Sequence, residues 1–360
     1  MMKVLVSGAS VGGPVLAHWL GRHGYDVTVV ERAPAPRKGG QAVDLRGAAL
    51  TVAARMGVLA EIEALRTTMR GMSMVDRDGN ETMRSTEETF SGGRFDSPDV
   101  EIMRDDLTRI LVAAGGARHV YGDSIATLTE DGGVTFESGA EDCYDYVIGA
   151  DGLHSNVRRL AFGPESRFVH HLGTYVSIFT TENFLGLDRW QTWFGEGGAG
   201  GAVFSDRDGS EMRVNLGFEA EEPIDYDHRD LDAQRRLVER RCARVWEAPR
   251  LLEAMWKADD FYFDAMAQVR MEHWTKGRVA LVGDAGYCAS PLSGQGTSLA
   301  MVGAYVLAEE LGADPATAFA RYEERMRPFV AANQALALEN PGRGAAPESV
   351  QRAANAITLD

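Results

Sequence analysis

The segment Met2–Pro14, MKVLVSGASVGGP, decides the fold of this chain. Residues 3–7 are a continuous, mostly apolar run, which predicts a strand buried on both faces of a parallel sheet. A glycine-rich turn begins at Gly8, and it is followed by a helical pattern over residues 14–23 and by the strand-like run YDVTVVER, residues 25–32. A strand, a glycine turn, a helix and a second strand within about thirty residues are the geometry that binds a dinucleotide.

The glycine turn suits a pyrophosphate for a physical reason. Where a strand ends and a helix begins, unpaired backbone N–H groups and the positive end of the helix dipole face the ligand. Gly8 permits the tight turn and Gly13 permits close packing of helix on strand, but Ser10 stands where the second glycine usually lies. Serine is small and its hydroxyl can donate to a phosphate, so the binding site stays open. The predicted phosphate contacts are Gly8, Ser10, Val11, Gly12 and Gly13.

An acidic residue follows at the spacing that a bound adenosine requires. Glu31 lies 18 residues after Gly13, at the end of the second predicted strand, where a carboxylate bonds the ribose hydroxyls. A free acid at this position disfavours a phosphate on that ribose, so the turn favours FAD or NAD over NADP. Glu31 and the adjacent Arg32 are therefore the predicted contacts on the adenosine side.

Composition excludes several classes of function. The 360 residues, 44% of them hydrophobic, suffice for one large domain or two ordinary ones. A net charge of -16 repels nucleic acids and anionic membranes, so a small-molecule ligand is favoured over either partner. Three widely spaced cysteines, an odd number, suit a reducing compartment and show no metal-ligand spacing. No signal segment or membrane span is visible, so we expect a cytoplasmic protein without a metal.

The remaining pattern predicts two interleaved units. Residues 48–65, 103–116 and 229–246 have helical spacing, residues 72–85 form a hairpin around Asp78-Gly79, and Pro328 should kink or interrupt the last helix. Short strands separated by turns over residues 174–219 predict a mainly antiparallel sheet. We expect an α/β fold with a Rossmann-like nucleotide-binding domain (residues 1–71, 98–170 and 268–336), a mainly antiparallel substrate domain (72–97 and 171–267), a C-terminal helix and a loosely ordered tail (337–360).

Two further strands end in polar turns, and their sequences are specific. One is DYVIGADGLHSNVR, residues 145–158, and the other is GDAGYCASPLSGQG, residues 283–296. Together with the first turn and with RDDL, residues 104–107, they resemble the single-component FAD-dependent monooxygenases, the aromatic hydroxylase group that includes the tetracycline-inactivating flavoenzymes. The resemblance covers residues 3–336. One departure is visible, because the usual Gly-Asp-Ala-Ala-His reads Gly-Asp-Ala-Gly-Tyr here, which puts a histidine role at Tyr287 in doubt.

The resemblance implies FAD as the bound dinucleotide and further contacts to it. Asp284 is placed to accept hydrogen bonds from the ribityl hydroxyls, and the turn before a helix starting near Thr297 would face the pyrimidine edge of the flavin. Arg46 and Arg104 match basic positions near FAD, and Asp151 lies in a segment implicated in FAD and nicotinamide handling. The implied contacts are Arg46, Arg104, Asp151, Gly283, Asp284, Pro291, Gly294, Gly296 and Thr297.

The resemblance also implies the chemistry. NADPH or NADH reduces the flavin transiently, O2 adds at C4a, and the hydroperoxide hydroxylates an aromatic or polyketide-like molecule, so no protein residue is assigned as catalytic. Candidate substrate contacts are Trp193, Phe204, Arg213, Asn215 and Pro291, although the aromatic residues equally suit the core and Arg213 the surface. A halogenase, a reductase or desaturase, and a non-catalytic FAD-binding protein remain alternatives. We expect a monomer or a weak homo-oligomer.

Overall fold

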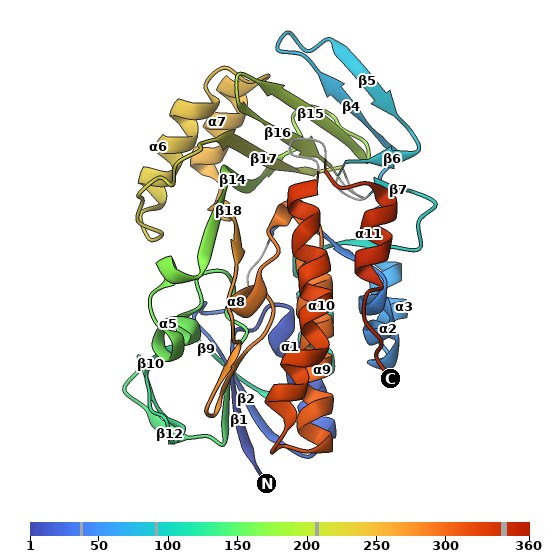
Figure 1. Ribbon diagram of the computed structural model, residues 1–360. Coiled ribbons are helices and arrows are strands. Elements are labelled where there is room, and N and C mark those ends of the chain that lie inside the picture. Colours follow the sequence, from blue (N-terminus) through green and yellow to red (C-terminus); the bar gives the residue numbers. More distant parts are fainter. Residues whose placement is uncertain (37–38, 91–92, 206–208, 340–343) are drawn as a thin grey trace.

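A six-stranded sheet forms the base of the molecule in the computed structural model, which describes residues 1–36, 39–90, 93–205, 209–339 and 344–360 (Figure 1). Its strand order is β19-β20-β13-β1-β2-β9, and all pairs are parallel except that of β19 with β20. These strands are β1 (Lys3–Ser7), β2 (Asp26–Glu31), β9 (Arg118–Tyr121), β13 (Tyr146–Gly149), β19 (Thr275–Lys276) and β20 (Val279–Leu281). The predicted strand-turn-helix-strand unit is confirmed as β1, α1 (Gly12–Arg22) and β2.

Helices bury one face of this sheet. α1, α9 (Gly296–Ala313) and α10 (Ala318–Glu339) lie side by side along it (Figure 1), and α1 also packs on α4 (Arg104–Gly115). Residues buried on β1, such as Val4, Leu5 and Val6, are fully covered, as expected of a parallel strand between layers. The part of the chain that the structure describes has no helix long and apolar enough to cross a membrane.

A seven-stranded sheet forms the second layer, and the prediction of a mainly antiparallel sheet is confirmed. Its order is β18-β14-β17-β16-β15-β4-β5, with only β15 and β4 parallel. The strands are β4 (Gly71–Val75), β5 (Glu81–Ser85), β14 (Val169–Glu182), β15 (Trp190–Glu196), β16 (Ala199–Phe204), β17 (Glu211–Glu219) and β18 (Tyr262–Val269). Helices α6 (Leu231–Cys242) and α7 (Ala248–Lys257) pack on its outer face through a second apolar core. We propose that the chain has the nucleotide-binding domain and the substrate domain with the bounds expected from the sequence. The strands of each sheet lie within the corresponding ranges, and none extends beyond them by more than two residues.

Smaller elements connect and flank the two sheets. β3 and β8 pair antiparallel, as do β6 and β7, while β10, β11 and β12 form a three-stranded sheet. Their bounds are β3 (Ala42–Leu45), β6 (Glu88–Thr89), β7 (Gly93–Arg94), β8 (Val100–Met103), β10 (Ile125–Leu128), β11 (Gly133–Phe136) and β12 (Glu141–Cys143). The remaining helical segments are α2 (Ala48–Arg55), α3 (Leu59–Ala64), α5 (Asn156–Phe162), η1 (Glu165–Arg167), α8 (Asp284–Tyr287), η2 (Pro291–Ser293) and α11 (Pro347–Ala354).

Three helix predictions differ from the structure. Residues 48–65 form α2 and α3 rather than one helix, because Gly57 adopts a left-handed φ of 76° between them. The charged helix predicted over residues 229–246 is α6, which ends at Cys242. Pro328 does not interrupt α10, because Pro328 and Glu324, whose carbonyl loses its usual partner, are both exposed to water.

The expectation of a loosely held tail is wrong for residues 344–360, whereas residues 340–343 of that call lie outside the described part of the chain. α11 packs on α10 and buries Ala353 and Ala354, and the Asn333 side chain donates to the Ala353 carbonyl at 3.1 Å. Arg55 donates to the carbonyl of Leu359 at 2.9 Å. The alanines that favoured a loose tail therefore supply close packing instead, since Ala354 of α11 lies so near Gly47 that an added Cβ there would be 2.4 Å from the Ala354 carbonyl oxygen.

Tyr287, the departure from the family pattern, lies in the core and not in the cleft. Its hydroxyl is 2.8 Å from that of Tyr322, which donates to the Leu281 carbonyl at 2.8 Å. The space for this tyrosine comes from Gly303 on α9, where an added Cβ would lie 1.9 Å from the Tyr287 hydroxyl oxygen.

Gly303→Ala should therefore destabilise the protein by about 2 kcal/mol through overpacking, measured by thermal or denaturant unfolding. Gly21→Ala on α1 is the matched control, since its added Cβ meets nothing within 4 Å and helix propensity favours alanine by roughly 0.5–1 kcal/mol. Equal melting temperatures for both variants would contradict the assigned packing.

Candidate functional site

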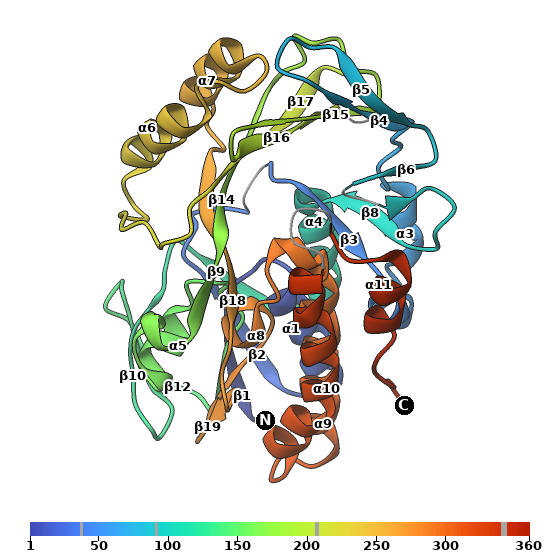
Figure 2. The same ribbon diagram turned by 45° about the horizontal axis from the view of Figure 1, so that its top comes forward.

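The seven-stranded sheet lies across the carboxyl ends of the six-stranded sheet's strands (Figure 2). A large cleft of about 3010 Å³ is lined by residues of both. Its base is formed by the three predicted turns at the carboxyl ends of β1, β13 and β20, and its opposite wall is the inner face of the seven-stranded sheet. One bound small molecule needs roughly 300–1,000 Å³. The cleft therefore has room for a dinucleotide together with a second ligand.

The first turn is shaped by two close backbone approaches. Gly8 has a φ of 110°, and an added Cβ there would lie 2.3 Å from the Ala150 carbonyl oxygen. A Cβ on Gly13 would lie 1.9 Å from the Gly8 carbonyl oxygen. Of the predicted phosphate contacts, Gly8, Ser10, Val11 and Gly12 line the cleft, whereas Gly13 lies behind them and packs α1 onto the turn.

Glu31 ties the first turn to the second strand. Its carboxylate accepts hydrogen bonds from the backbone N–H groups of Ala9, at 3.0 Å, and Ala33, at 2.9 Å. An ionised carboxylate has about four acceptor positions, so two remain for a ligand's hydroxyl groups. Glu31 and Arg32 both line the cleft, and the Arg32 guanidinium lies 3.5 Å from the Ser124 hydroxyl.

Asp151, expected as a cofactor contact, also accepts hydrogen bonds from the protein itself. Its carboxylate accepts hydrogen bonds from the Ser155 hydroxyl and from the N–H groups of Asn156 and Val157, at 2.5, 2.9 and 3.1 Å. Burial raises the pKa of Asp151, and these hydrogen bonds act against that rise. Asp151 thus organises the start of α5, while it also lines the cleft.

The third turn brings an acid to the start of α9. Gly283 has a φ of 65°, Asp284 begins α8, and a Cβ on Gly296 would lie 3.8 Å from the Asp284 carboxylate. Burial raises the pKa of Asp284. The predicted residues Gly283, Asp284, Pro291, Gly294, Gly296 and Thr297 all line the cleft around the amino-terminal end of α9. The structure thus brings the three turns to one base.

Two arginines predicted near the cofactor also line the cleft. Arg46 is only 8% exposed and lies 2.8 Å from the Asp44 carboxylate and 3.9 Å from that of Asp99. Burial raises the pKa of Asp44 to about 7, although the Arg46 charge lowers it. Arg104 stacks against the backbone at Gly40, where an added Cβ would lie 2.8 Å from its Nε.

One row of side chains crosses the inner face of the seven-stranded sheet. Strand register places six residues in line, and all six line the cleft: Met74, Trp193, Ala202, Asn215, Ile178 and Tyr262. Phe90 meets Trp193 edge to face with ring centroids 5.4 Å apart. Large hydrophobic residues that remain exposed gather here, since Met74, Phe90, Leu231, Tyr262, Leu292 and Leu338 all line the cleft. Such a concentration marks a ligand site.

Four of the five predicted substrate contacts line this cleft. Trp193, Phe204 and Asn215 lie on the sheet wall, and Pro291 lies opposite them in the third turn. Arg213 shares a strand face with Asn215 but lies outside the lining, and its guanidinium is 3.1 Å from the Glu211 carboxylate.

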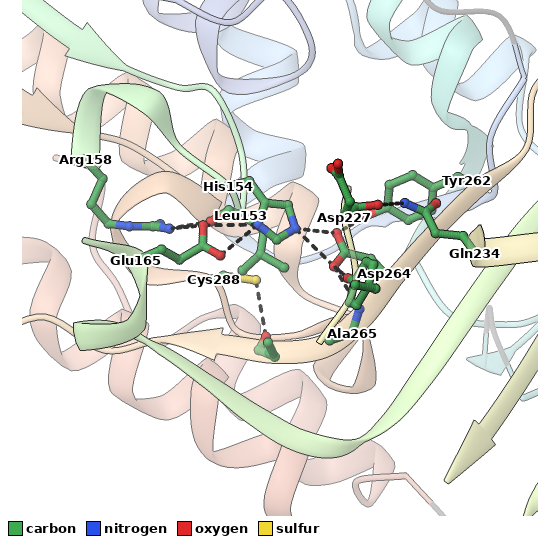
Figure 3. A network of polar contacts seen from close by, with 12 residues as sticks. Leu153, His154, Arg158, Glu165, Asp227, Gln234, Tyr262, Asp264, Ala265 and Cys288 are labelled. Atoms are coloured by element: carbon green, nitrogen blue, oxygen red, sulfur yellow. Dashed lines mark hydrogen bonds and ion pairs between the residues drawn. The ribbon is translucent and has the colours of Figure 1, made fainter. Parts of the chain in front are cut away.

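Sequence reasoning missed a polar network between the two layers (Figure 3). His154 bonds the Glu165 carboxylate through Nδ1 at 3.0 Å and the Asp264 carboxylate through Nε2 at 3.1 Å. Arg158, with no exposed surface, lies 3.1 Å from Glu165 and donates to the carbonyls of Leu153 and Ala285. No local sequence pattern predicts this network, because its members come from separate turns and from β18.

Among the described residues, one trio brings metal-ligand atoms together, and it belongs to this network. Ligand atoms of His154, Glu165 and His228 lie within 4.8 Å of one another. Both ring nitrogens of His154 already bond carboxylates, so the contacts are accounted for as ion pairs.

The network predicts a pH dependence of stability. Although burial alone would lower it, hydrogen bonds to Asp264 and Glu165 raise the pKa of His154 from 6.5 to about 9. Because the folded pKa exceeds the unfolded one, the stabilisation is complete below pH 6.5 and disappears as pH rises through about 9. We expect a loss on the order of 1 kcal/mol, a discounted value because His154 is about a third exposed.

Urea unfolding at several pH values measures this loss. His154→Gln should flatten the decline between pH 6.5 and 9, since glutamine does not titrate. His23→Gln, which removes a peripheral hydrogen bond to Glu309, is the matched control and should keep the decline. An identical pH profile for native protein and His154→Gln would refute the assignment.

Comparison with known proteins bears on the cleft. Residues 1–335 match the FAD binding domain family. Over 340 residues the chain is 43% identical to a flavin-dependent monooxygenase from an unknown prokaryotic organism, covering 93% of this chain and 88% of the relative. An uncharacterized protein of Mycobacterium tuberculosis is 52% identical over all of this chain and 99% of its own length. The crystal structure of the tetracycline destructase Tet(55) superposes with a TM-score of 0.88 at 39% identity, covering 100% of this chain and 98% of that one.

Proposed function

Because this chain belongs to the FAD binding domain family and is a single-component flavin-dependent monooxygenase, we propose that it uses NADPH or NADH and O2 to hydroxylate an aromatic or polyketide-like small molecule. The observation that carries the proposal is the cleft, where three strand-ending turns meet at one base and an apolar sheet wall faces them. The first arrangement suits a dinucleotide and the second suits a ring compound.

The residues of the base fit FAD. Gly8, Ser10 and Gly12 would hold the pyrophosphate at the start of α1, and Glu31 would use its remaining acceptor positions for the adenosine ribose. Asp284 lies beside the start of α9, where it would accept from the ribityl hydroxyls. When bound, FAD supplies the electron transfer from nicotinamide and the activation of O2.

The chain's own residues would orient the substrate, place positive charge near the flavin and exclude water from the cleft. The amino-terminal end of α9 would offer backbone N–H groups and a positive dipole to the flavin. Arg46, held by Asp44 and Asp99, adds positive charge beside Gly294 in the same turn. The apolar wall around Trp193 would orient the substrate and exclude water from the bound ring compounds.

Substrate chemistry follows from the wall. Its row of aromatic and aliphatic side chains suits a flat, multi-ring compound, and a similar protein is named a tetracycline destructase. Tetracyclines are therefore the first compounds to test, followed by other polyketides and by simple phenols.

The experiment is a substrate screen on the purified protein. We expect yellow protein with FAD, and NADPH or NADH oxidation that accelerates with a substrate and consumes O2, while the product gains one oxygen atom by mass. Anaerobic turnover would favour a reductase or desaturase, and chloride-dependent product would favour a halogenase. Colourless protein that FAD does not reconstitute would refute the proposal.

A further inference from the structure

One tyrosine on the cleft wall, Tyr262, already donates its hydroxyl proton to a carboxylate of the protein. Tyr262 begins β18, is 42% exposed and lines the cleft, and its hydroxyl donates to the Asp264 carboxylate at 2.7 Å (Figure 3). A phenolic hydroxyl has one proton to donate and two lone pairs to accept with. Toward a ligand in the cleft, the Tyr262 oxygen therefore acts as an acceptor.

Asp264 holds that arrangement firmly. Its carboxylate also accepts from the backbone N–H of Ala265 at 2.8 Å and from the Tyr226 hydroxyl at 3.2 Å, and its side chain is only 6% exposed. Although burial alone would raise the pKa of Asp264, the hydrogen bond and charge of His154 lower it. Asp264 is thus an ionised acceptor. It keeps the Tyr262 hydroxyl proton directed toward itself and away from the cleft.

The neighbours of Tyr262 define the rest of the contact. In the row across the sheet, Ile178 is the partner of Tyr262, and Asn215 is the partner of Ile178 on the next strand. Neighbouring strands lie about 4.8 Å apart, so Asn215 lies two strands, roughly 10 Å, from Tyr262. Between them is the apolar side chain of Ile178. A flat ring system of two or three rings spans that distance while its edge meets the Tyr262 oxygen.

We propose that Tyr262 is a specificity-determining residue, whose phenolic oxygen accepts a hydrogen bond from a hydroxyl or N–H group on the substrate ring. This inference rests on the proposed function, because it assumes a ring compound in the cleft. The enzyme then prefers phenols, enols and N–H compounds to their alkylated counterparts. A ring carboxylate at this position is disfavoured, since it brings no donor and meets the negative charge of Asp264.

Matched pairs of compounds test the inference directly. We would compare 2-hydroxyanthraquinone with 2-methoxyanthraquinone, and 2-naphthol with 2-methoxynaphthalene, and measure each dissociation constant from the change in flavin absorbance or fluorescence. For native protein we expect the hydroxyl compound to bind about tenfold more tightly than its ether, the effect of roughly one hydrogen bond. In Tyr262→Phe the ratio should fall to about one, chiefly through weaker binding of the hydroxyl compound.

Two controls separate recognition from stability. Tyr146→Phe removes a hydroxyl far from the cleft lining, where the ring packs on Phe319, and should keep the native ratio. Tyr262→Phe should also keep FAD binding and its melting temperature to within a few degrees, because only one part-buried hydrogen bond is lost.

The outcomes distinguish this inference from the proposed function. Failure to retain FAD or to oxidise NADPH and NADH with any compound refutes the function itself. A native protein that is active but binds ethers as well as hydroxyl compounds, or binds none of the hydroxyl probes, overturns the inference alone. So does a Tyr262→Phe variant that loses FAD affinity, because the hydroxyl would then serve the cofactor.

Discussion

Gly13→Ala protein is expected to be purified without its yellow colour. The new methyl group would lie 1.9 Å from the Gly8 carbonyl oxygen, which is backbone and has no freedom to rotate away. Relief requires α1 to move off the end of β1, and the phosphate-binding turn opens as a result. We expect FAD affinity to fall roughly a hundredfold or more, measured by reconstitution with FAD and flavin fluorescence.

The adjacent glycine provides a matched control. A methyl group on Gly12 would point into the protein, 3.5 Å from the Val282 side chain, which is an ordinary contact. Gly12→Ala should therefore stay yellow with FAD affinity within a few fold of native. Retention of FAD by Gly13→Ala, or equal losses in both variants, would refute the geometry assigned to the turn.

Arg158→Met is expected to lose about 3 kcal/mol of stability and most of its FAD. Arg158 is fully buried and joins the second turn, through the Leu153 carbonyl, to the third turn, through the Ala285 carbonyl. Its charge also offsets that of Glu165. Methionine has a similar length, but it leaves two carbonyls without this donor and leaves the half-buried Glu165 carboxylate with a single cation, His154. Denaturant unfolding and FAD titration measure the two losses.

The neighbouring arginine is the control for that variant. Arg159 is exposed and its guanidinium donates to the Asn156 side chain three residues away, so Arg159→Met should change stability by less than about 0.5 kcal/mol. Equal stability of the two variants would show that the two turns hold their positions without Arg158. Arg158→Lys should lose about as much stability and FAD as Arg158→Met, because a single ammonium group does not reach both carbonyls and the carboxylate.

The base of the cleft was predictable because its residues act through the backbone. A buried strand followed by glycines specifies a turn locally, so Gly8, Gly283 and their neighbours could be placed from short runs of sequence. The same holds for the mainly antiparallel sheet, whose strands alternate apolar and polar residues between turn signals.

Features that depend on distant partners were not predictable. Arg213 alternates with Asn215 as a cleft residue would, but the sequence equally allowed a surface position, and only the folded structure shows that Arg213 lies outside the lining. Residues 344–360 have the composition of a loosely held tail, but the surface of α10 and the space beside Gly47 give them a place to pack. His154, Glu165 and Asp264 are unremarkable until folding brings three segments together.

The interleaved order of the strands has a consequence for how the protein is made in the cell. β1 and β2 leave the ribosome first, but β20, Asp284 and α9 come from the last quarter of the 360-residue chain. Nascent chains therefore expose one unfinished parallel sheet until translation is nearly complete, a period in which chaperones would protect it. We therefore expect flavin loading to follow translation, and a shortage of riboflavin should lower the yield of folded protein.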